Sequence, residues 1–148
     1  MGIINMVKNI KEIHPKDVLL VKVGTFYYTY GKDSYIISYL FKYKINKKDD
    51  ICFCGFPASN LNKVIAGLEQ KQINYIVLDK RNNYDIDNKS DNKKLNKYDK
   101  VFESAKEKIN YDMRVKRIVE FLKENRENKK IILEMEELII EGRKVQSN

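Results

Sequence analysis

The hydrophobic positions of the first thirty residues follow a helical pattern and then a strand pattern. Residues 2–13 carry apolar side chains at spacings of three and four, which predicts an amphipathic helix that ends before His14. Residues 17–23 form a nearly continuous apolar run, and a glycine separates them from residues 26–30. These two runs predict a buried strand and its hairpin partner.

The next fifty residues continue this alternation. Their apolar positions predict helices over residues 33–44 and 57–71, and strands over residues 51–56 and 74–79. Strands that alternate with amphipathic helices indicate an α/β class fold, a mixed sheet covered by helices. We therefore predict one α/β unit over residues 1–80.

The polar character of residues 81–100 sets them apart from this unit. The segment contains few large apolar residues and many Asn, Asp and Lys, so we expect an exposed, poorly ordered linker. Residues 101–148 return to a helical pattern and form a helical extension. The apolar stripe changes side near residues 110–112, which predicts either a helix break or a helix with two apolar faces.

A polar turn at residues 125–128 separates two segments of the helical extension. We expect residues 113–124 and a helix around Ile131 to form an antiparallel helical hairpin. Basic residues on the first helix could form a second contact surface for nucleic acid or pair with acidic residues on the second helix, and we expect the pairing because the opposite charge is present there. These are Arg114, Lys116 and Arg117 on one side and Glu134, Glu136 and Glu137 on the other.

The charge of the chain favours polyanionic partners. Its 148 residues include 29 Lys and Arg against 21 Asp and Glu, a formal net charge of +8. The abundance of Lys, Asn and Ile is also typical of an AT-rich genome, so the charge alone does not identify a nucleic acid. No run approaches the ~18 apolar residues of a membrane span, and the first residues lack a secretory signal, so we expect a cytoplasmic protein without membrane contact.

Residue types that carry catalysis or bind metals are sparse. The chain has no phosphate-binding loop of the Walker type and no recognisable acid–base pair. His14 is the only histidine, so we expect Cys52 and Cys54 to be buried free thiols rather than ligands of a metal. The sequence predicts a binding module without enzyme activity, metal or cofactor.

The aromatic residues of the second strand are the most informative feature of the chain. Period-two alternation sends Phe26, Tyr28 and Tyr30 to one face of the strand and Tyr27 and Thr29 to the other. Two interpretations of the first face stay open. Phe26 and Tyr28 are either an exposed stacking surface for nucleic-acid bases or core residues packed against the helix over residues 33–44.

This segment resembles the start of the mismatch-recognition domain, domain I, of MutS proteins. In that family an apolar strand, a Gly-Asp-Phe-Tyr-Glu segment, a helix and a Gly-x-Pro segment follow one another. Here Gly24-Thr25-Phe26-Tyr27-Tyr28 follows the strand, and Gly55-Phe56-Pro57 follows the helix. In the family the Phe ring stacks on a mispaired base and the Glu carboxylate hydrogen-bonds to it. Phe26 matches the ring, whereas Tyr28 stands in place of the Glu.

The resemblance covers the first half of the chain and implies a MutS domain I fold. It also implies DNA binding through Phe26 and Tyr28, linked to mismatch repair or other DNA transactions, without the ATPase of MutS. The lysines near this unit in the sequence are either phosphate contacts or a solvated basic surface. They are Lys22, Lys32, Lys42, Lys44, Lys47 and Lys48.

The sequence is also compatible with a second function. A protein-interaction adaptor of the same fold would dimerise, or dock a partner, through residues 101–142. An apolar stripe that changes side cannot be buried entirely on one small sheet, and an exposed stripe is typical of an interface. The alternative is that the helical hairpin packs against the α/β unit of its own chain.

Overall fold

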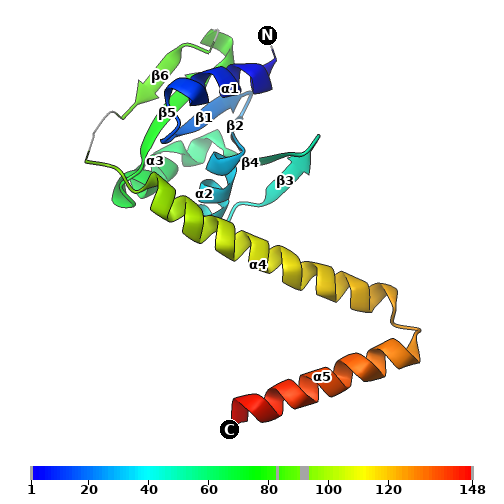
Figure 1. Ribbon diagram of the computed structural model, residues 1–148. Helices are drawn as coiled ribbons and strands as arrows, with labels where there is room; N and C mark the ends of the chain where they lie inside the picture. The colour runs from blue at the N-terminus through cyan, green and yellow to red at the C-terminus, as the bar shows by residue number, and fades with distance from the viewer. Residues whose placement is uncertain (1, 83, 91–93, 148) are drawn as a thin grey trace. The chain divides into compact units, whose positions relative to one another are not determined.

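The computed structural model describes residues 2–82, 84–90 and 94–147. The chain divides into two compact units, Met1–Ile109 and Asn110–Asn148. The first unit contains a six-stranded sheet with helices on both faces (Figure 1). None of the helices in the described ranges combines the length and the hydrophobicity that crossing a bilayer requires.

The elements of the first unit follow the predicted order, with additions. They are α1 (Ile3–Ile13), β1 (Asp17–Val23), β2 (Phe26–Tyr30), α2 (Lys32–Phe41), β3 (Ile45–Lys48), β4 (Ile51–Pro57), the 3-10 turn η1 (Ala58–Asn60), α3 (Leu61–Gln70), β5 (Asn74–Asp79), the 3-10 turn η2 (Lys80–Asn82), β6 (Ile86–Lys89) and the start of α4 (Tyr98–Glu124). The strand order is β3-β4-β2-β1-β5-β6. Only the β1–β5 pair is parallel among the ladders of this sheet. The predicted mixed sheet is confirmed.

The two faces of the sheet are covered to different extents. One face packs against α2, α3 and the start of α4, in a core that includes Tyr27, Phe56 and Ile36. The other face packs against α1, and the buried strand residues beneath this helix, such as Leu19 and Ile76, come from β1 and β5. Helix α1 covers mainly the β1–β5 part of this second face. The side chains that β2 and β4 place on this face are therefore more exposed.

Helix α2 ends three residues before the predicted helix does, and a strand that was not predicted, β3, follows it. Helix α2 ends at Phe41, because Lys42 adopts a left-handed conformation with a φ of 62° that closes the helix. The chain then forms β3, which has one apolar residue, and returns through Asp49 and Asp50 into β4. Both aspartates have positive φ, 51° and 62°, as a type I′ hairpin turn requires.

Residues 81–100, predicted to be a polar linker, contribute structure to the first unit. Strand β6 pairs with β5, and all four of its side chains are exposed. An edge strand is held by its backbone ladder, so it needs no apolar pattern that sequence inspection would find. Tyr98, also from this segment, is only 2% exposed. The part of the predicted linker at residues 83 and 91–93 lies outside the described residues.

A buried polar cluster explains why Tyr98 belongs to the core. The Asp33 carboxylate is completely buried and accepts hydrogen bonds from the Leu19 N–H (3.0 Å), the Lys11 amine (2.9 Å) and the Tyr98 hydroxyl. Burial raises the pKa of Asp33, against the lowering effects of Lys11 and the Tyr98 hydrogen bond. Burial also raises the pKa of Tyr98 far above its usual range, and the adjacent Asp33 adds to this increase. One side chain of α2 thus holds α1, β1 and α4 together.

The second unit consists of the end of α4 and α5 (Lys129–Ser147). Helix α4 continues through residues 110–112 without a break, so the alternative of a helix break is wrong. The turn after it is polar, as predicted, and Asn128 Oδ1 accepts the Ile131 N–H at 3.3 Å at the start of α5. Ile118, Phe121 and Met135 line a shallow hollow in this unit.

The expected ion pairs between α4 and α5 are not formed. Within the described ranges, no salt bridge joins the basic residues 114, 116 and 117 to the acidic residues 134, 136 and 137. All six of these side chains are exposed, and solvation competes effectively with an exposed ion pair. Arg114 and Arg117 instead border the hollow formed by Ile118, Phe121 and Met135.

Candidate nucleic-acid interface

The turn between β1 and β2 determines where Phe26 lies. Gly24 has a φ of 65°, whereas the φ of Thr25 is not positive, which is the pattern of a two-residue type II′ hairpin turn. This turn sets the register in which Phe26 faces Val23 directly across the ladder. The Thr25 carbonyl also accepts the Ala58 N–H at 2.8 Å, so the turn is attached to the end of β4. Phe26 therefore begins β2 at a well-supported corner of the sheet.

Phe26 lies at the surface and not in the core. Its side chain is 41% exposed, while the next residue, Tyr27, is 5% exposed and stacks on Phe56 with ring centroids 5.7 Å apart. Helix α2 packs against the face of the sheet that carries Tyr27, which is opposite to the face of Phe26. The interpretation in which Phe26 packs against α2 is therefore wrong.

Tyr28 rests on the backbone of the neighbouring strand. It pairs with Gly55 in the β2–β4 ladder. A Cβ atom added to Gly55 would lie 2.8 Å from Tyr28 Cε1 and 3.0 Å from Cδ1, which is closer than carbon atoms approach without displacement. The tyrosine ring therefore fills the space above the glycine. Its centroid is 6.2 Å from that of Phe26, and the two ring planes are tilted by 59°.

Further residues join this face of the sheet through strand pairing. Pro57 faces Phe26, and Phe53 faces Tyr30, which is half-buried. We call Phe26, Tyr28, Gly55, Phe53 and Pro57 the aromatic face. Phe53 and Gly55 come from a strand more than twenty residues later, so only the β2–β4 register shows that they belong to it. In the sequence, the Gly-x-Pro segment indicated two of these residues, Gly55 and Pro57.

The predicted lysines do not gather around the aromatic face. Lys48 is on the same face of the sheet as the aromatic face. It pairs with Ile51, which precedes Phe53 by two residues on β4 and therefore lies on the same side of the strand. Lys47 pairs with Cys52 and lies on the opposite face, 3.8 Å from the Asp50 carboxylate. Lys42 and Lys44 are exposed after the end of α2.

Lys22 and Lys32 are also directed elsewhere. Lys22 faces Tyr27 and Asp79 in its two ladders, so it belongs to the opposite face of the sheet. On that face, hydrogen bonds from Arg81 hold the pKa of the Asp79 carboxyl below its usual range. Lys32 begins α2, and its amine lies 5.1 Å above the Phe102 ring. The structure thus brings Phe26, Tyr28 and Lys48 to one face.

The two cysteines occupy one side of β4, as their spacing predicts. Cys54 is buried, and burial raises the pKa of its thiol to about 12. Cys52 is partly buried, and its sulfur lies 3.7 Å from the Tyr35 hydroxyl oxygen. Across the described ranges, no group of three or more His, Cys, Asp or Glu side chains is arranged to hold a metal ion.

Comparison with known proteins identifies the family to which the chain belongs. No curated protein matches the chain. A protein-family model described as MutS domain I matches residues 1–120, which covers the first unit and continues into α4. The match covers most of the chain, so the chain belongs to the MutS domain I family.

Proposed function

We propose that the first unit is a DNA-binding module that contacts bases through Phe26 and Tyr28 and acts without catalysis of its own. Membership of the MutS domain I family supports a DNA-binding, mismatch-recognition type of domain. The observation that carries the proposal for this chain is the exposed Phe26 ring, which lies beside Tyr28 at the place of the family's Phe-x-Glu unit. An exposed aromatic ring on a rigid strand is a ready stacking surface for a base.

The aromatic face favours distorted or opened DNA over regular duplex. A ring can stack on a base, or enter between two bases, only where the base stack opens, and a mispaired site opens at lower cost. Stacking on an aromatic ring contributes about 1 to 3 kcal/mol per base and is tolerant of sequence. Tyr28 offers a hydroxyl but no carboxylate, so we propose a weaker preference for mismatches than a Phe-x-Glu unit gives.

Few positive charges accompany these rings. Lys48 is the predicted lysine that shares their face, and the overall charge of +8 adds a general attraction for polyanions. A module with few phosphate contacts binds weakly and loses affinity steeply as salt rises. We therefore expect micromolar or weaker binding at low salt.

The test measures binding to paired, mispaired and single-stranded oligonucleotides of equal length in a salt titration. Phe26→Ala should weaken binding to the mispaired duplex by roughly tenfold, which corresponds to the loss of one stacking contact. Tyr39→Ala is the matched control, because Tyr39 is 39% exposed but lies on α2, away from the aromatic face. Absence of binding at low salt, or equal losses for the two variants, would contradict the proposal.

Tyr28→Glu examines the departure from the family motif. It restores the carboxylate that hydrogen-bonds to a mispaired base in Phe-x-Glu proteins, and it should raise the ratio of mismatch to duplex affinity. Because Tyr28 is only partly buried, the variant is expected to fold. A well-folded Tyr28→Glu protein with an unchanged ratio would contradict the idea that this corner reads mispaired bases.

A second candidate function is self-association through the helical unit. Large apolar side chains of this unit are exposed, among them Tyr111 (62%) and Leu138 (60%). Exposed apolar stripes on helices are typical of interfaces, and a symmetric dimer is the commonest way to cover them. Two linked modules would also bind one DNA more tightly than one module does.

Light scattering over a range of concentrations tests self-association. We expect dimers that dissociate on Leu138→Asp, whereas Arg143→Ala, an exposed position on the same helix outside residues 101–142, should leave the mass unchanged. A monomer at high concentration, with the same mass for both variants, would exclude the dimer through residues 101–142.

A further inference from the structure

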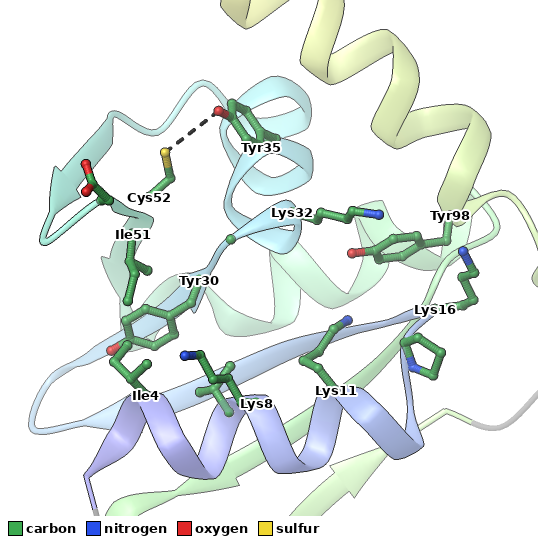
Figure 2. Close-up of a pocket in the computed structure, with 14 residues that line it drawn as sticks. Ile4, Lys8, Lys11, Lys16, Tyr30, Lys32, Tyr35, Ile51, Cys52 and Tyr98 are labelled. Carbon is green, nitrogen blue, oxygen red and sulfur yellow. Dashed lines mark hydrogen bonds between the residues drawn. The ribbon is translucent and has the colours of Figure 1, made fainter.

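A hollow of the first unit lies at the end of β2 that carries Tyr30, the end opposite to Phe26. It has a volume of about 590 Å³ and lies among α1, the β2–α2 junction, the β3–β4 hairpin and the first residue of α4 (Figure 2). Its walls are mainly apolar and aromatic, with Val7, Tyr30, Tyr35 and Ile51 among them. A volume of this size is typical of sites for small organic ligands, which also have mainly apolar walls and a few polar groups.

Four lysines surround this hollow, which we call the lysine pocket. Lys8 and Lys11 come from α1, Lys16 from the turn after it, and Lys32 from the first position of α2. Figure 2 shows their side chains around the same space. Lysines are common partners of phosphate groups, for which they act as point charges.

Two of the four amines are already neutralised by acidic side chains. Lys11 is paired with the buried Asp33 at 2.9 Å, and Lys16 is paired with Asp99. Throughout residues 2–82, 84–90 and 94–147, no acidic side chain forms a salt bridge with Lys8 or Lys32. The Lys32 amine lies 5.1 Å from the centre of the Phe102 ring, a contact that does not neutralise its charge. The charges of Lys8 and Lys32 are therefore available to an anion in the pocket.

The acidic side chain that lines the pocket does not cancel this charge. It belongs to Asp50, in the turn of the β3–β4 hairpin, where it is fully exposed and 3.8 Å from the Lys47 amine. The start of α2 presents its first backbone N–H groups without a side-chain cap, because the preceding residue is Gly31, and the acidic Asp33 of its first turn is paired with Lys11. Charge and cavity thus coincide at one place.

We propose that the lysine pocket binds a phosphate monoester attached to a planar organic group, the chemistry of a nucleoside monophosphate. The phosphate would lie between Lys8 and Lys32, and the planar group would pack against Tyr30 and Tyr35. The same chemistry has two sources, a free mononucleotide and the 5′-phosphorylated end of a nucleic-acid strand. This site is separate from the Phe26 corner and does not depend on the proposed function.

The experiment measures equilibrium binding of four probes to the full chain by titration calorimetry at low salt. They are a deoxynucleoside monophosphate, the corresponding nucleoside, and one trinucleotide with either a 5′-phosphate or a 5′-hydroxyl. We expect a phosphorylated probe to bind at least tenfold more tightly than the same probe without its phosphate. One charge-assisted hydrogen bond gives a difference of this size. Binding of the phosphorylated trinucleotide alone would identify the strand end as the source, and binding of the mononucleotide alone would identify the free nucleotide.

Substitutions assign the binding to this pocket. Lys8→Gln removes one of the two available charges from an exposed position, so it should not disturb folding, and we expect about a tenfold loss of affinity. Lys63→Gln is the matched control, because Lys63 is also exposed but lies on α3. Equal affinities for phosphorylated and unphosphorylated probes, or equal effects of the two substitutions, would overturn the proposal.

Discussion

Gly55→Ala is a direct measurement of the contact between Tyr28 and the backbone of β4. In a strand, alanine is favoured over glycine by roughly 0.5 to 1 kcal/mol, because glycine loses more conformational entropy on folding. Gly55 does not have a positive φ, so this gain applies to it. The new Cβ atom opposes this gain in stability, because it would lie 2.8 Å from Tyr28 Cε1. Overpacking of this kind costs about 1 to 3 kcal/mol, so the substitution should destabilise the protein.

The same substitution should have the opposite sign when the ring is absent. In a Tyr28→Ala background nothing opposes the new methyl group, so Gly55→Ala should stabilise by roughly 0.5 to 1 kcal/mol. The wild type, the two single variants and the double variant form a double-mutant cycle. Its coupling energy should be about 1 to 3 kcal/mol, which is the cost of the steric overlap alone. This reversal of sign is specific to a ring that occupies the space above Gly55.

Urea unfolding of the four proteins provides the measurement. Nine of the ten tyrosines, all except Tyr111, lie in the first unit, so tyrosine circular dichroism in the near ultraviolet reports its unfolding. Gly142→Ala is a matched control, since its Cβ would meet no atom within 4 Å, and it should leave the unfolding of the first unit unchanged. A coupling energy below about 0.5 kcal/mol would refute the contact.

Three further predictions concern stability and reactivity. Phe26→Ala should lower the free energy of unfolding by about 1 kcal/mol and Tyr27→Ala by roughly 3 to 5, because only the second side chain is fully buried; equal losses in urea unfolding would contradict this. Since the pKa of Asp33 is raised in the folded state, ionisation of this carboxyl opposes folding. The stability of the wild type relative to Asp33→Asn should therefore fall as pH rises from about 4 through the raised pKa, by at most about 1.4 kcal/mol per pH unit, and a pH-independent difference would contradict the shift. A thiol reagent should modify the partly exposed Cys52 in the native protein and the buried Cys54 only after unfolding, which mass spectrometry of the labelled peptides can measure.

The elements that the sequence predicted correctly are those in which local pattern and burial agree. Strands β1 and β5 are buried on both faces, so they appear as continuous apolar runs. The position of Phe26 also follows from local features, because a glycine turn and period-two alternation place it on the face opposite to Tyr27. Whether that face was buried could not be predicted, since this depends on where α1 packs.

The features that the sequence did not predict depend on contacts between distant residues. Strands β3 and β6 are polar edges held by backbone ladders. Tyr98 lies in a polar segment and is buried because its hydroxyl reaches Asp33, sixty-five residues earlier. Lys22 and Lys32 are near Phe26 in the sequence, but strand alternation and the start of α2 direct them elsewhere. Proximity along the chain is therefore weak evidence for a shared phosphate-binding surface.

The packing of Tyr28 explains how the family's corner can differ in this chain and stay intact. A glutamate at this position would leave the space above Gly55 open to water, whereas the tyrosine ring occupies it and lies beside Phe26. The exchange replaces a carboxylate, which repels phosphates and accepts hydrogen bonds from a base, with a second aromatic surface. Two rings increase stacking, which depends little on base identity, and remove the hydrogen bond that distinguishes one base pair from another. On the proposed DNA-binding function, we therefore expect the Phe26 and Tyr28 pair to favour an opened base stack over a particular mispair, and Tyr28→Glu to shift that balance toward the mispair.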